Sequence, residues 1–482
     1  MNQKIPILSD VLTGLYTDFY ELTMIQGYFL EGKKEEKAVF DYFFRSNPYN
    51  GGYVIFAGLE NMLYLLNNYT FPQESLDYLS RLGFQDEFLK YLADFRFNGD
   101  LWSVREGEIV FPNEPIVRVE GNIMETQVIE TLLLNILNFE SLVATKASRI
   151  REAAGTEALI ADFGMRRAQG IAALQASRAA IIGGFNSTSN VAAALLFGLE
   201  ATGTMAHSWI QSFQDELTAF RKYASLYEDH CVLLVDTYDT LNCGVPNAIR
   251  VAKELEARGK KLLAIRLDSG DLTYLSRKAR KMLDEAGLDY VAIIASNQLD
   301  EWIIRSLKEQ GAGITSFGVG TKLVTGHPDA ALDGVYKISE SNGRPVMKLS
   351  ENIQKMTLPG KKNILRFING DGKFGGDAIV MEEEDGPMDE FYHPLFPEKK
   401  KNVKEFSFER LLCPVMVEGE MRISKVPVQE IAAYARSRMR ILDDSHKRFE
   451  NPHVYKVGIS KKLMNLRDAV KKEIQRKYRK QK

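Results

Sequence analysis

His207 is the side chain whose type and setting point most directly to chemistry. It follows a turn of small residues at Gly203 and Thr204, and Ser208 lies beside it. A histidine whose ring is oriented by a neighbouring carboxylate can attack a phosphate group through its free nitrogen. A lone histidine is more often structural, and that interpretation is kept for His230, His327, His393, His446 and His453. His207 is therefore the candidate nucleophile.

Acidic and basic residues occur in the same part of the chain as His207. The acids that could hold ribose hydroxyls or a hydrated Mg²⁺ are Asp236, Asp239, Asp268 and Asp271. The planar guanidinium donors that match phosphate or carboxylate groups are Arg166, Arg167 and Arg266. Simpler interpretations remain open, because Asp268 to Asp271 could be a helix cap with a turn and the paired arginines could lie on the surface. Phe163 could equally be a core residue.

Gly318, Gly320 and Thr321 form a short segment that could bind a phosphate group. Glycine lets the backbone approach a ligand closely, so N–H groups and the threonine hydroxyl could surround the phosphate oxygens. A single Gly-x-Gly-Thr segment is weak evidence by itself. Together with the mixed charges it indicates a phosphorylated, anionic substrate such as a sugar diphosphate with its metal.

Alternating strands and helices must position these residues. Apolar runs begin at 232, 262, 291 and 314, and their spacings of 30, 29 and 23 residues match one strand-helix unit each. Helices are predicted between them, ended by Gly259, Gly287 and Gly311. Three further strands are predicted upstream, at 159–161, 180–182 and 200–202. Six or seven parallel units favour a βα barrel, in which groups that follow the strands share one face.

The flanking sequence follows a different pattern. Alternating apolar positions with turn residues predict antiparallel strands at 104–119, 334–349 and 374–381, and the turn pairs are Asn342-Gly343 and Asn369-Gly370. Helices are predicted at 18–30, 59–66 and 126–139. We therefore expect an N-terminal accessory α+β domain at 1–140, a catalytic α/β barrel at 141–350, and a β-rich and helical segment at 351–482 that partly joins the accessory domain.

Composition and charge exclude several classes of protein. The 482 residues carry a formal net charge of −2, so the whole molecule has no basic field of the kind that holds nucleic acid. The basic tail at 461–482 has an apolar stripe and is read as a solvated amphipathic helix. The longest apolar run, 191–199, is too short to span a bilayer, and the N-terminus has no secretory pattern. Three scattered cysteines fit a reducing compartment, so the cytoplasm is expected.

Several segments in a fixed order resemble one known family, the nicotinate phosphoribosyltransferases. The resemblance extends from Leu15 to about Pro359, and is weaker beyond. The segments that carry it are Tyr16–Met24, Phe43–Arg45, Gly164–Gly170, Gly183–Asn190, Gly203–Ser208, Asp236–Thr240, Arg266–Asp271 and Gly318–Thr321.

This resemblance implies a fold, a reaction and an assembly. The fold would be an irregular parallel βα barrel of the type II phosphoribosyltransferase kind, with an accessory β-rich domain built from both termini. The reaction would join nicotinate to phosphoribosyl pyrophosphate with ATP as co-substrate, giving nicotinate mononucleotide, pyrophosphate, ADP and phosphate, for NAD salvage. The protein would be a homodimer with active sites shared between subunits. Mg²⁺ would be bound through the substrate phosphates, with Asp239 or Asp271 as candidate contacts and no direct set of protein ligands.

The resemblance also implies a role for each matching residue. His207 would be transiently phosphorylated by ATP, with Asp236 and Asp268 as the other catalytic residues. Thr204 and Arg266 would contact nicotinate, Phe163 would stack on its ring, and Tyr20 with Asp18 would reach the base from the partner subunit. The remaining expected substrate contacts are Arg166, Ser187, Ser296, Gly318, Gly320 and Thr321.

The choice of base can be argued from one segment. Relatives that use nicotinamide have an aspartate that accepts from the amide N–H, whereas residues 186–190 contain no acid. A buried acid there would repel a carboxylate, so the absence favours nicotinate. The alternatives are a sibling transferase acting on nicotinamide or quinolinate, and a non-catalytic barrel that binds a nucleotide. A binding protein has no need of a phosphoryl acceptor such as His207.

Overall fold

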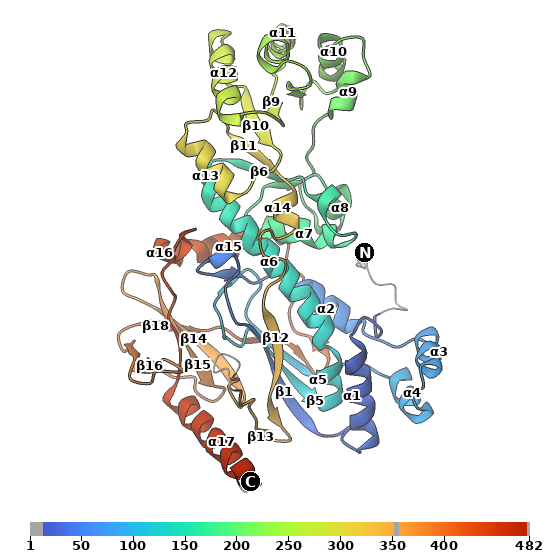
Figure 1. Ribbon diagram of the computed structural model, residues 1–482, viewed down its shortest axis with the longest axis vertical. Helices are drawn as coiled ribbons and strands as arrows, with labels where there is room; N and C mark the ends of the chain where they lie inside the picture. Colours follow the sequence, from blue (N-terminus) through green and yellow to red (C-terminus); the bar gives the residue numbers. More distant parts are fainter. Residues whose placement is uncertain (1–12, 351–355, 480–482) are drawn as a thin grey trace. The chain divides into compact units, whose positions relative to one another are not determined.

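A computed structural model describes residues 13–350 and 356–479 of the chain (Figure 1). The chain divides into two compact units, one formed by 1–145 with 331–482 and the other by 146–330. Helix α6 (Glu130–Ala154) crosses the boundary between the two units at 145–146. The segment 331–350, which we expected in the catalytic domain, belongs to the first unit.

The first unit contains a seven-stranded antiparallel sheet that combines strands from both ends of the chain. Its order is β13 (Arg344–Pro345), β12 (Gly334–Ser341), β1 (Lys37–Phe44), β5 (Val117–Asn122), β3 (Asp100–Ser103), β19 (Cys413–Val417) and β20 (Glu420–Met421). Asn342 and Gly343 join β12 to β13 with positive φ angles of 49° and 74°, the backbone that a tight hairpin turn requires. This turn was predicted from the sequence.

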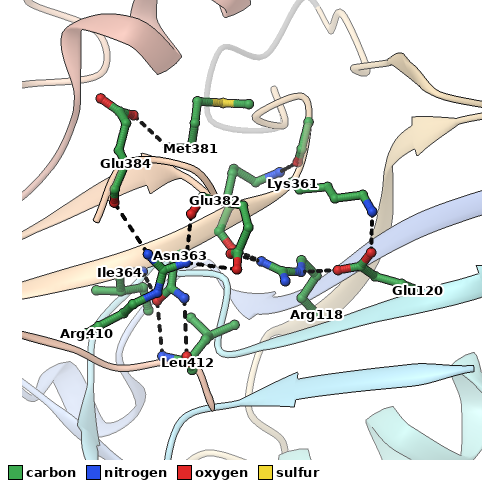
Figure 2. Close-up of polar contacts among 12 residues, drawn as sticks. Arg118, Glu120, Lys361, Asn363, Ile364, Met381, Glu382, Glu384, Arg410 and Leu412 are labelled. Atoms are coloured by element: carbon green, nitrogen blue, oxygen red, sulfur yellow. Dashed lines mark hydrogen bonds and ion pairs between the residues drawn. The ribbon is translucent and has the colours of Figure 1, made fainter. Parts of the chain in front are cut away.

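A second sheet of the same unit comes from residues beyond 361. Its order is β17 (Lys400–Asn402), β16 (Glu390–Tyr392), β21 (Val457–Ile459), β15 (Phe374–Met381), β14 (Lys362–Ile368) and β18 (Ser407–Arg410), and the short pair β2 (Val54–Ile55) and β4 (Ile109–Val110) lies apart from it. Figure 2 shows how buried Arg118 of β5 reaches this sheet. Its guanidinium donates to Glu120, to Glu382 and to the backbone oxygen of Lys362. Charged side chains therefore join the two sheets.

The first unit contains eight further helices besides α6 in its described residues. They are α1 (Phe19–Leu30), α2 (Leu59–Asn67), α3 (Gln73–Arg81), α4 (Asp86–Ala93), α5 (Ile123–Val128), α15 (Val428–Ile441), α16 (Asp444–Lys447) and α17 (Lys461–Arg479), with a 3₁₀ turn at Pro48–Asn50. Helix α17 buries Leu463, Met464 and Val470 and leaves its lysines outward, as the apolar stripe predicted. None of the helices in the described part of the chain is long and apolar enough to span a bilayer.

The second unit is built on a parallel sheet. Its order is β7 (Ser187–Thr188), β6 (Leu159–Asp162), β11 (Ser316–Val319), β10 (Ala292–Ser296), β9 (Ala264–Leu267) and β8 (Val232–Leu234). All neighbours run parallel, as the spacing predicted. A single parallel bridge from Thr188 to Ala201 extends the sheet beyond β7. Among the described residues no pairing joins Ala201 to β8, so the hydrogen bonds define a parallel sheet and not a closed barrel.

Helices connect the strands of this sheet, and a last short helix, α14, follows β11. They are α7 (Ala172–Ile182), α8 (Val191–Phe197), α9 (His207–Gln211), α10 (Glu216–Leu226), α11 (Val245–Glu256), α12 (Leu272–Glu285), α13 (Glu301–Glu309) and α14 (Thr321–Val324), with short turns η2 (Met165–Arg167) and η3 (Thr240–Gly244). Gly259, Gly287 and Gly311 follow three of them with φ near +70°. Glycine adopts this left-handed backbone without steric cost, which is why these helices end where the sequence predicted.

One predicted strand was wrong. The apolar run 180–182 is the end of α7, and the strand that follows is Ser187–Thr188. Every residue of α7 after the first is buried, so its apolar pattern shows no exposed face that would distinguish a helix from a buried strand. The predicted strand at 200–202 is reduced to the single bridge at Ala201.

Candidate active site

The parallel sheet of the second unit brings the candidate residues to one edge. Phe163 directly follows β6, Asp236 follows β8, Asp268 follows β9, Ser296 ends β10 and Gly318 lies near the end of β11. Because parallel strands all end on the same side, side chains from these positions can converge. Hydrogen bonds join Asp268 to Ser296 and to the Asp236 carboxylate at this edge.

Arg266 is the centre of this cluster. Its Nε donates to Ser296 Oγ at 2.8 Å, Nη1 donates to Thr204 Oγ1 at 2.9 Å, and Nη2 donates to Asp268 Oδ1 at 2.7 Å. The guanidinium carbon lies 5.4 Å from the centre of the Phe163 ring, within the range of a cation–π contact. All three guanidinium nitrogens are engaged, so the orientation of the side chain is well defined.

His207 lies within reach of this cluster through Asp236. The histidine begins α9, its Nδ1 lies 3.0 Å from Thr237 Oγ1, and its Nε2 lies 4.0 Å from Asp236 Oδ1. The other carboxylate oxygen of Asp236 accepts from Asp268 N at 2.8 Å and from Ser269 Oγ at 2.7 Å. Asp236 therefore connects the candidate nucleophile to the Arg266 cluster.

The exposures of these side chains fit chemistry at a surface-accessible site. The His207 side chain is 39% exposed, while that of Asp236 is 1% exposed. Asp236 Oδ1 is buried and has no hydrogen-bond partner in the described structure. A buried carboxylate oxygen without a partner is costly, so a ligand group or a protonated His207 that contacts this oxygen would be stabilising.

The Phe163 ring is held against the end of β11. A Cβ atom added to Gly318 would come within 2.4 Å of the ring atoms Cδ2 and Cε2, and one added to Gly320 would meet the Phe163 carbonyl oxygen at 2.9 Å. The Phe163 N–H donates to Val319 O at 2.8 Å. Both glycines therefore permit close packing against Phe163. Their expected contact with a phosphate remains a prediction.

Comparison with known proteins decides the family. The described N-terminal region matches the model of the nicotinate phosphoribosyltransferase N-terminal domain at 15–138, the family model matches 158–380, and the C-terminal domain model matches 361–467. A nicotinate phosphoribosyltransferase from Bacillus subtilis is 44% identical over 457 residues, covering 93% of each chain. This chain belongs to the nicotinate phosphoribosyltransferase family.

Further relatives span nearly the whole chain. The nicotinate phosphoribosyltransferase of Dictyostelium discoideum is 36% identical, over 96% of this chain and 89% of its own length. The crystal structure of the human nicotinic acid phosphoribosyltransferase has a TM-score of 0.85 and 29% identity, covering 94% and 99% of the two chains. A nicotinate-nucleotide pyrophosphorylase structure from Pyrococcus furiosus has a TM-score of 0.72 and 25% identity, covering 90% and 97%. The family predicted from the sequence is confirmed.

Asp162 is a buried residue of the site whose role was not predicted from the sequence. It is fully buried, and its carboxylate accepts from Gly164 N at 2.8 Å, Ser177 Oγ at 2.7 Å and Thr188 Oγ1 at 2.8 Å. Burial raises the pKa of Asp162, and the three donors oppose this rise. Asp162 thus ties the turn that carries Phe163 to α7 and β7. An acid at the last position of an otherwise apolar strand was the available signal.

Besides Gly318 and Gly320, five predicted site residues of the second unit have no direct contact with Arg266 or His207 among the described interactions. Arg166 is exposed in η2, Ser187 is buried in β7, and Thr321 begins α14. Asp239 caps η3, where Asn242 N and Nδ2 donate to it at 2.9 Å and 3.0 Å and lower its pKa. Asp271 caps α12 by accepting from Tyr274 N at 3.0 Å. The capping alternative is thus confirmed for Asp271, and the substrate roles of all five stay predictions.

Tyr20 and Asp18 lie in the first unit, at the start of α1. Tyr20 is 47% exposed, and burial of part of the ring together with the neighbouring Glu21 raises the pKa of its hydroxyl. Thr131 Oγ1 donates to Asp18 Oδ2 at 3.2 Å. Glu21 is fully buried, and burial raises its pKa to about 7. The contact of Tyr20 and Asp18 with the base stays a prediction.

The acids of the rim suit a metal that arrives with its substrate. Within residues 13–350 and 356–479 no three histidine, cysteine or acidic side chains are grouped as a metal site. Asp239 and Asp271 are exposed, and carboxylate oxygens at such positions can accept hydrogen bonds from the waters of a hydrated Mg²⁺. Asp239 and Asp271 therefore stay the candidate contacts for a hydrated Mg²⁺.

Proposed function

We propose that this protein is an ATP-coupled nicotinate phosphoribosyltransferase that acts through a phosphohistidine at His207. Nicotinate and phosphoribosyl pyrophosphate would give nicotinate mononucleotide and pyrophosphate, with ATP cleaved to ADP and phosphate. The observation that carries this proposal is the continuous set of contacts from His207 through Asp236 and Asp268 to Arg266. Membership of the family supports nicotinate and phosphoribosyl pyrophosphate as the substrates.

The base would bind between Arg266 and Phe163. A guanidinium oriented by Ser296 and Thr204 offers a planar donor to the nicotinate carboxylate. Thr204 would contact the same carboxylate if its hydroxyl, which donates to Met205 O, turned toward the base. The Phe163 ring offers a face on which a pyridine ring can stack. Tyr20 and Asp18 would approach the same base from the partner subunit of a homodimer, as the family resemblance implies.

The transfer step needs little covalent chemistry from the protein. The lone pair of the pyridine nitrogen forms a bond to the anomeric carbon while the bond from that carbon to pyrophosphate breaks, and the electrons leave with the pyrophosphate oxygen. Positive charge develops on the ribose ring, and Asp236 and Asp268 would stabilise it electrostatically. Mg²⁺ would neutralise the leaving pyrophosphate when bound. No proton has to move, because the pyridine nitrogen carries none.

The remaining rim residues would orient the sugar diphosphate. Gly318, Gly320 and Thr321 would bind the ribose 5-phosphate, because backbone N–H groups and a hydroxyl can surround its oxygens. Arg166, exposed in η2, would contact the pyrophosphate or the base. Ser187 and Ser296 would complete the polar lining. Each group acts by holding the anomeric carbon within attack distance of the nitrogen.

ATP coupling would proceed through His207. An unprotonated ring nitrogen attacks the γ-phosphorus, the bond to the bridging oxygen breaks, and ADP leaves. Water later attacks the phosphohistidine and releases phosphate, which restores the free imidazole. The 39% exposure of the side chain leaves room for a phosphoryl group, and Asp236 beside it can orient the ring. The product would enter NAD salvage in the cytoplasm, because three scattered cysteines fit a reducing compartment.

Two measurements test this function. Purified protein with Mg²⁺, ATP and phosphoribosyl pyrophosphate should convert nicotinate in preference to nicotinamide or quinolinate when the bases compete. His207→Ala should abolish nicotinate-stimulated ATP hydrolysis and keep a wild-type circular dichroism spectrum. Preference for nicotinamide, or unchanged hydrolysis in the folded variant, would contradict the proposal.

A further inference from the structure

Arg266 has an anionic partner within the protein itself. Asp268 Oδ1 accepts from Arg266 Nη2 at 2.7 Å and also from Ser296 Oγ. The remaining guanidinium nitrogens donate to the hydroxyls of Ser296 and Thr204. The positive charge that would recognise the nicotinate carboxylate is therefore neutralised by a carboxylate of the protein itself.

This pairing opposes the binding of a carboxylate. A nicotinate carboxylate that reached Arg266 would lie beside Asp268, and two like charges at that distance repel each other in a partly desolvated site. The Arg266 side chain is only 15% exposed, so solvent screens the repulsion incompletely. Nicotinate must displace Asp268 from Arg266 or bind after something else has done so.

The backbone and side chain of Asp268 are held differently. Its N–H donates to the buried Asp236 carboxylate at 2.8 Å, which fixes the backbone. Its side chain is 30% exposed and can turn toward the solvent side of the rim. The contact of Arg266 with Thr204 does not involve Asp268, whereas the Ser296 hydroxyl that accepts from Arg266 Nε also donates to Asp268. Rotation of the Asp268 side chain would therefore release Nη2, while Thr204 still holds Nη1 and Ser296 Oγ can still accept from Nε.

We propose that Asp268 is a switch that couples the two substrates: the sugar diphosphate with its Mg²⁺ draws Asp268 away from Arg266 and so opens Arg266 to the carboxylate of the base. This inference rests on the proposed function, because it takes Arg266 as the carboxylate site and the rim acids as the contacts of the sugar diphosphate. Binding free energies are linked reciprocally, so nicotinate must strengthen binding of the sugar diphosphate by the same factor.

The test is binding calorimetry on the full-length protein. The probe for the first substrate is a carbocyclic analogue of phosphoribosyl pyrophosphate with Mg²⁺, which cannot react because its ring lacks the oxygen that stabilises the developing cation. For the wild-type protein, we expect the analogue to lower the Kd of nicotinate about tenfold, within the usual range of such couplings. Nicotinate should lower the Kd of the analogue by the same factor. A factor of one in the wild-type protein would overturn the proposal.

Asp268→Asn assigns the coupling to this residue. The substitution keeps the shape of the side chain and removes its charge, so nicotinate should bind the analogue-free variant about tenfold more tightly than the analogue-free wild type. Added analogue should then produce little further gain. Asp289→Asn is the matched control, because Asp289 is an exposed acid before β10, at the opposite end of the same sheet. The control should retain the full coupling.

The outcomes separate this inference from the proposed function. Unchanged nicotinate affinity in analogue-free Asp268→Asn, or full coupling in that variant, would overturn the switch. Asp268→Ala is read in the same way if the asparagine variant does not fold. Formation of nicotinate mononucleotide by the wild-type protein is measured in parallel. Formation of nicotinate mononucleotide without coupling between the two substrates would overturn only the switch. Failure to form this product would overturn the proposed function.

Discussion

Gly318→Ala should damage base binding through a single methyl group. The added Cβ would lie 2.4 Å from two atoms of the Phe163 ring, whereas ordinary contacts begin near 3.4 Å. The ring must therefore move by roughly 1 Å, the difference between these distances. Overpacking of this kind costs about 1–3 kcal/mol of stability. A misplacement of about 1 Å at a reacting group can cost on the order of 100-fold in rate.

Steady-state kinetics with nicotinate and thermal unfolding measure these two effects. We expect kcat/KM for nicotinate to fall at least tenfold, and the melting temperature to fall as well. Gly203→Ala is the control, because Gly203 lies on the same rim, has no positive φ, and has open space where its Cβ would be. That variant should keep wild-type stability. Wild-type kinetics for Gly318→Ala would refute the idea that Phe163 is held in place by close contact with Gly318.

Three further substitutions test other contacts. Thr237→Val removes the hydroxyl 3.0 Å from His207 Nδ1 and should slow ATP hydrolysis about tenfold, equivalent to roughly 1.4 kcal/mol of activation free energy. Thr237→Ser keeps a hydroxyl and should restore the wild-type rate. Equal rates for the wild type and Thr237→Val would contradict an orienting role for this hydroxyl. Asp162→Ala removes the buried acceptor shared by Gly164 N, Ser177 Oγ and Thr188 Oγ1 and should cost roughly 3 kcal/mol in urea unfolding. A loss of unfolding free energy under about 1 kcal/mol would argue against Asp162 as the residue that ties the Phe163 turn to α7 and β7. Glu114→Gln should flatten the pH dependence of stability.

The sign of the Glu114 effect follows from its surroundings. Glu114 is fully buried, and burial together with neighbouring Asp377 raises its pKa well above the ordinary value. A carboxyl whose pKa is higher in the folded than in the unfolded state takes up a proton on folding. Its contribution is fully present below the unfolded pKa and declines as pH rises, by up to about 1.4 kcal/mol per pH unit. Unfolding midpoints from pH 5 to 8 should therefore fall more steeply for wild type than for Glu114→Gln. Parallel curves would disprove this assignment.

Local sequence signals predicted the elements of the second unit well. Gly259, Gly287 and Gly311 end their helices because a left-handed residue costs glycine little, and this requirement is visible in the sequence. The strand predicted at 180–182 was wrong because α7 is buried on all sides and lacks the polar face that reveals helical periodicity. Barrel closure depends on pairing between strands far apart in the chain, which no local pattern specifies.

The sequence predicted which site residues follow the parallel strands, but not which of their side chains pair with each other. Arg266, Asp268 and Ser296 could be placed on one edge because parallel strands end together. The sequence did not reveal that Arg266 and Asp268 pair with each other, or that Thr237 is the neighbour of His207. Such pairs depend on side-chain rotamers and on distances of about 3 Å. The role of Asp162 was missed because its partners, Ser177 and Thr188, come from separate elements.

Phosphopeptide mapping shows whether His207 carries the phosphoryl group. The protein is incubated with Mg²⁺ and ATP labelled at the γ-phosphate, quenched in alkali, digested and mapped by mass spectrometry. We expect acid-labile phosphate on the peptide that contains His207, at a stoichiometry that falls when nicotinate and phosphoribosyl pyrophosphate are added. Phosphate on another residue, or no covalent phosphate in a preparation that still makes nicotinate mononucleotide, would contradict this expectation.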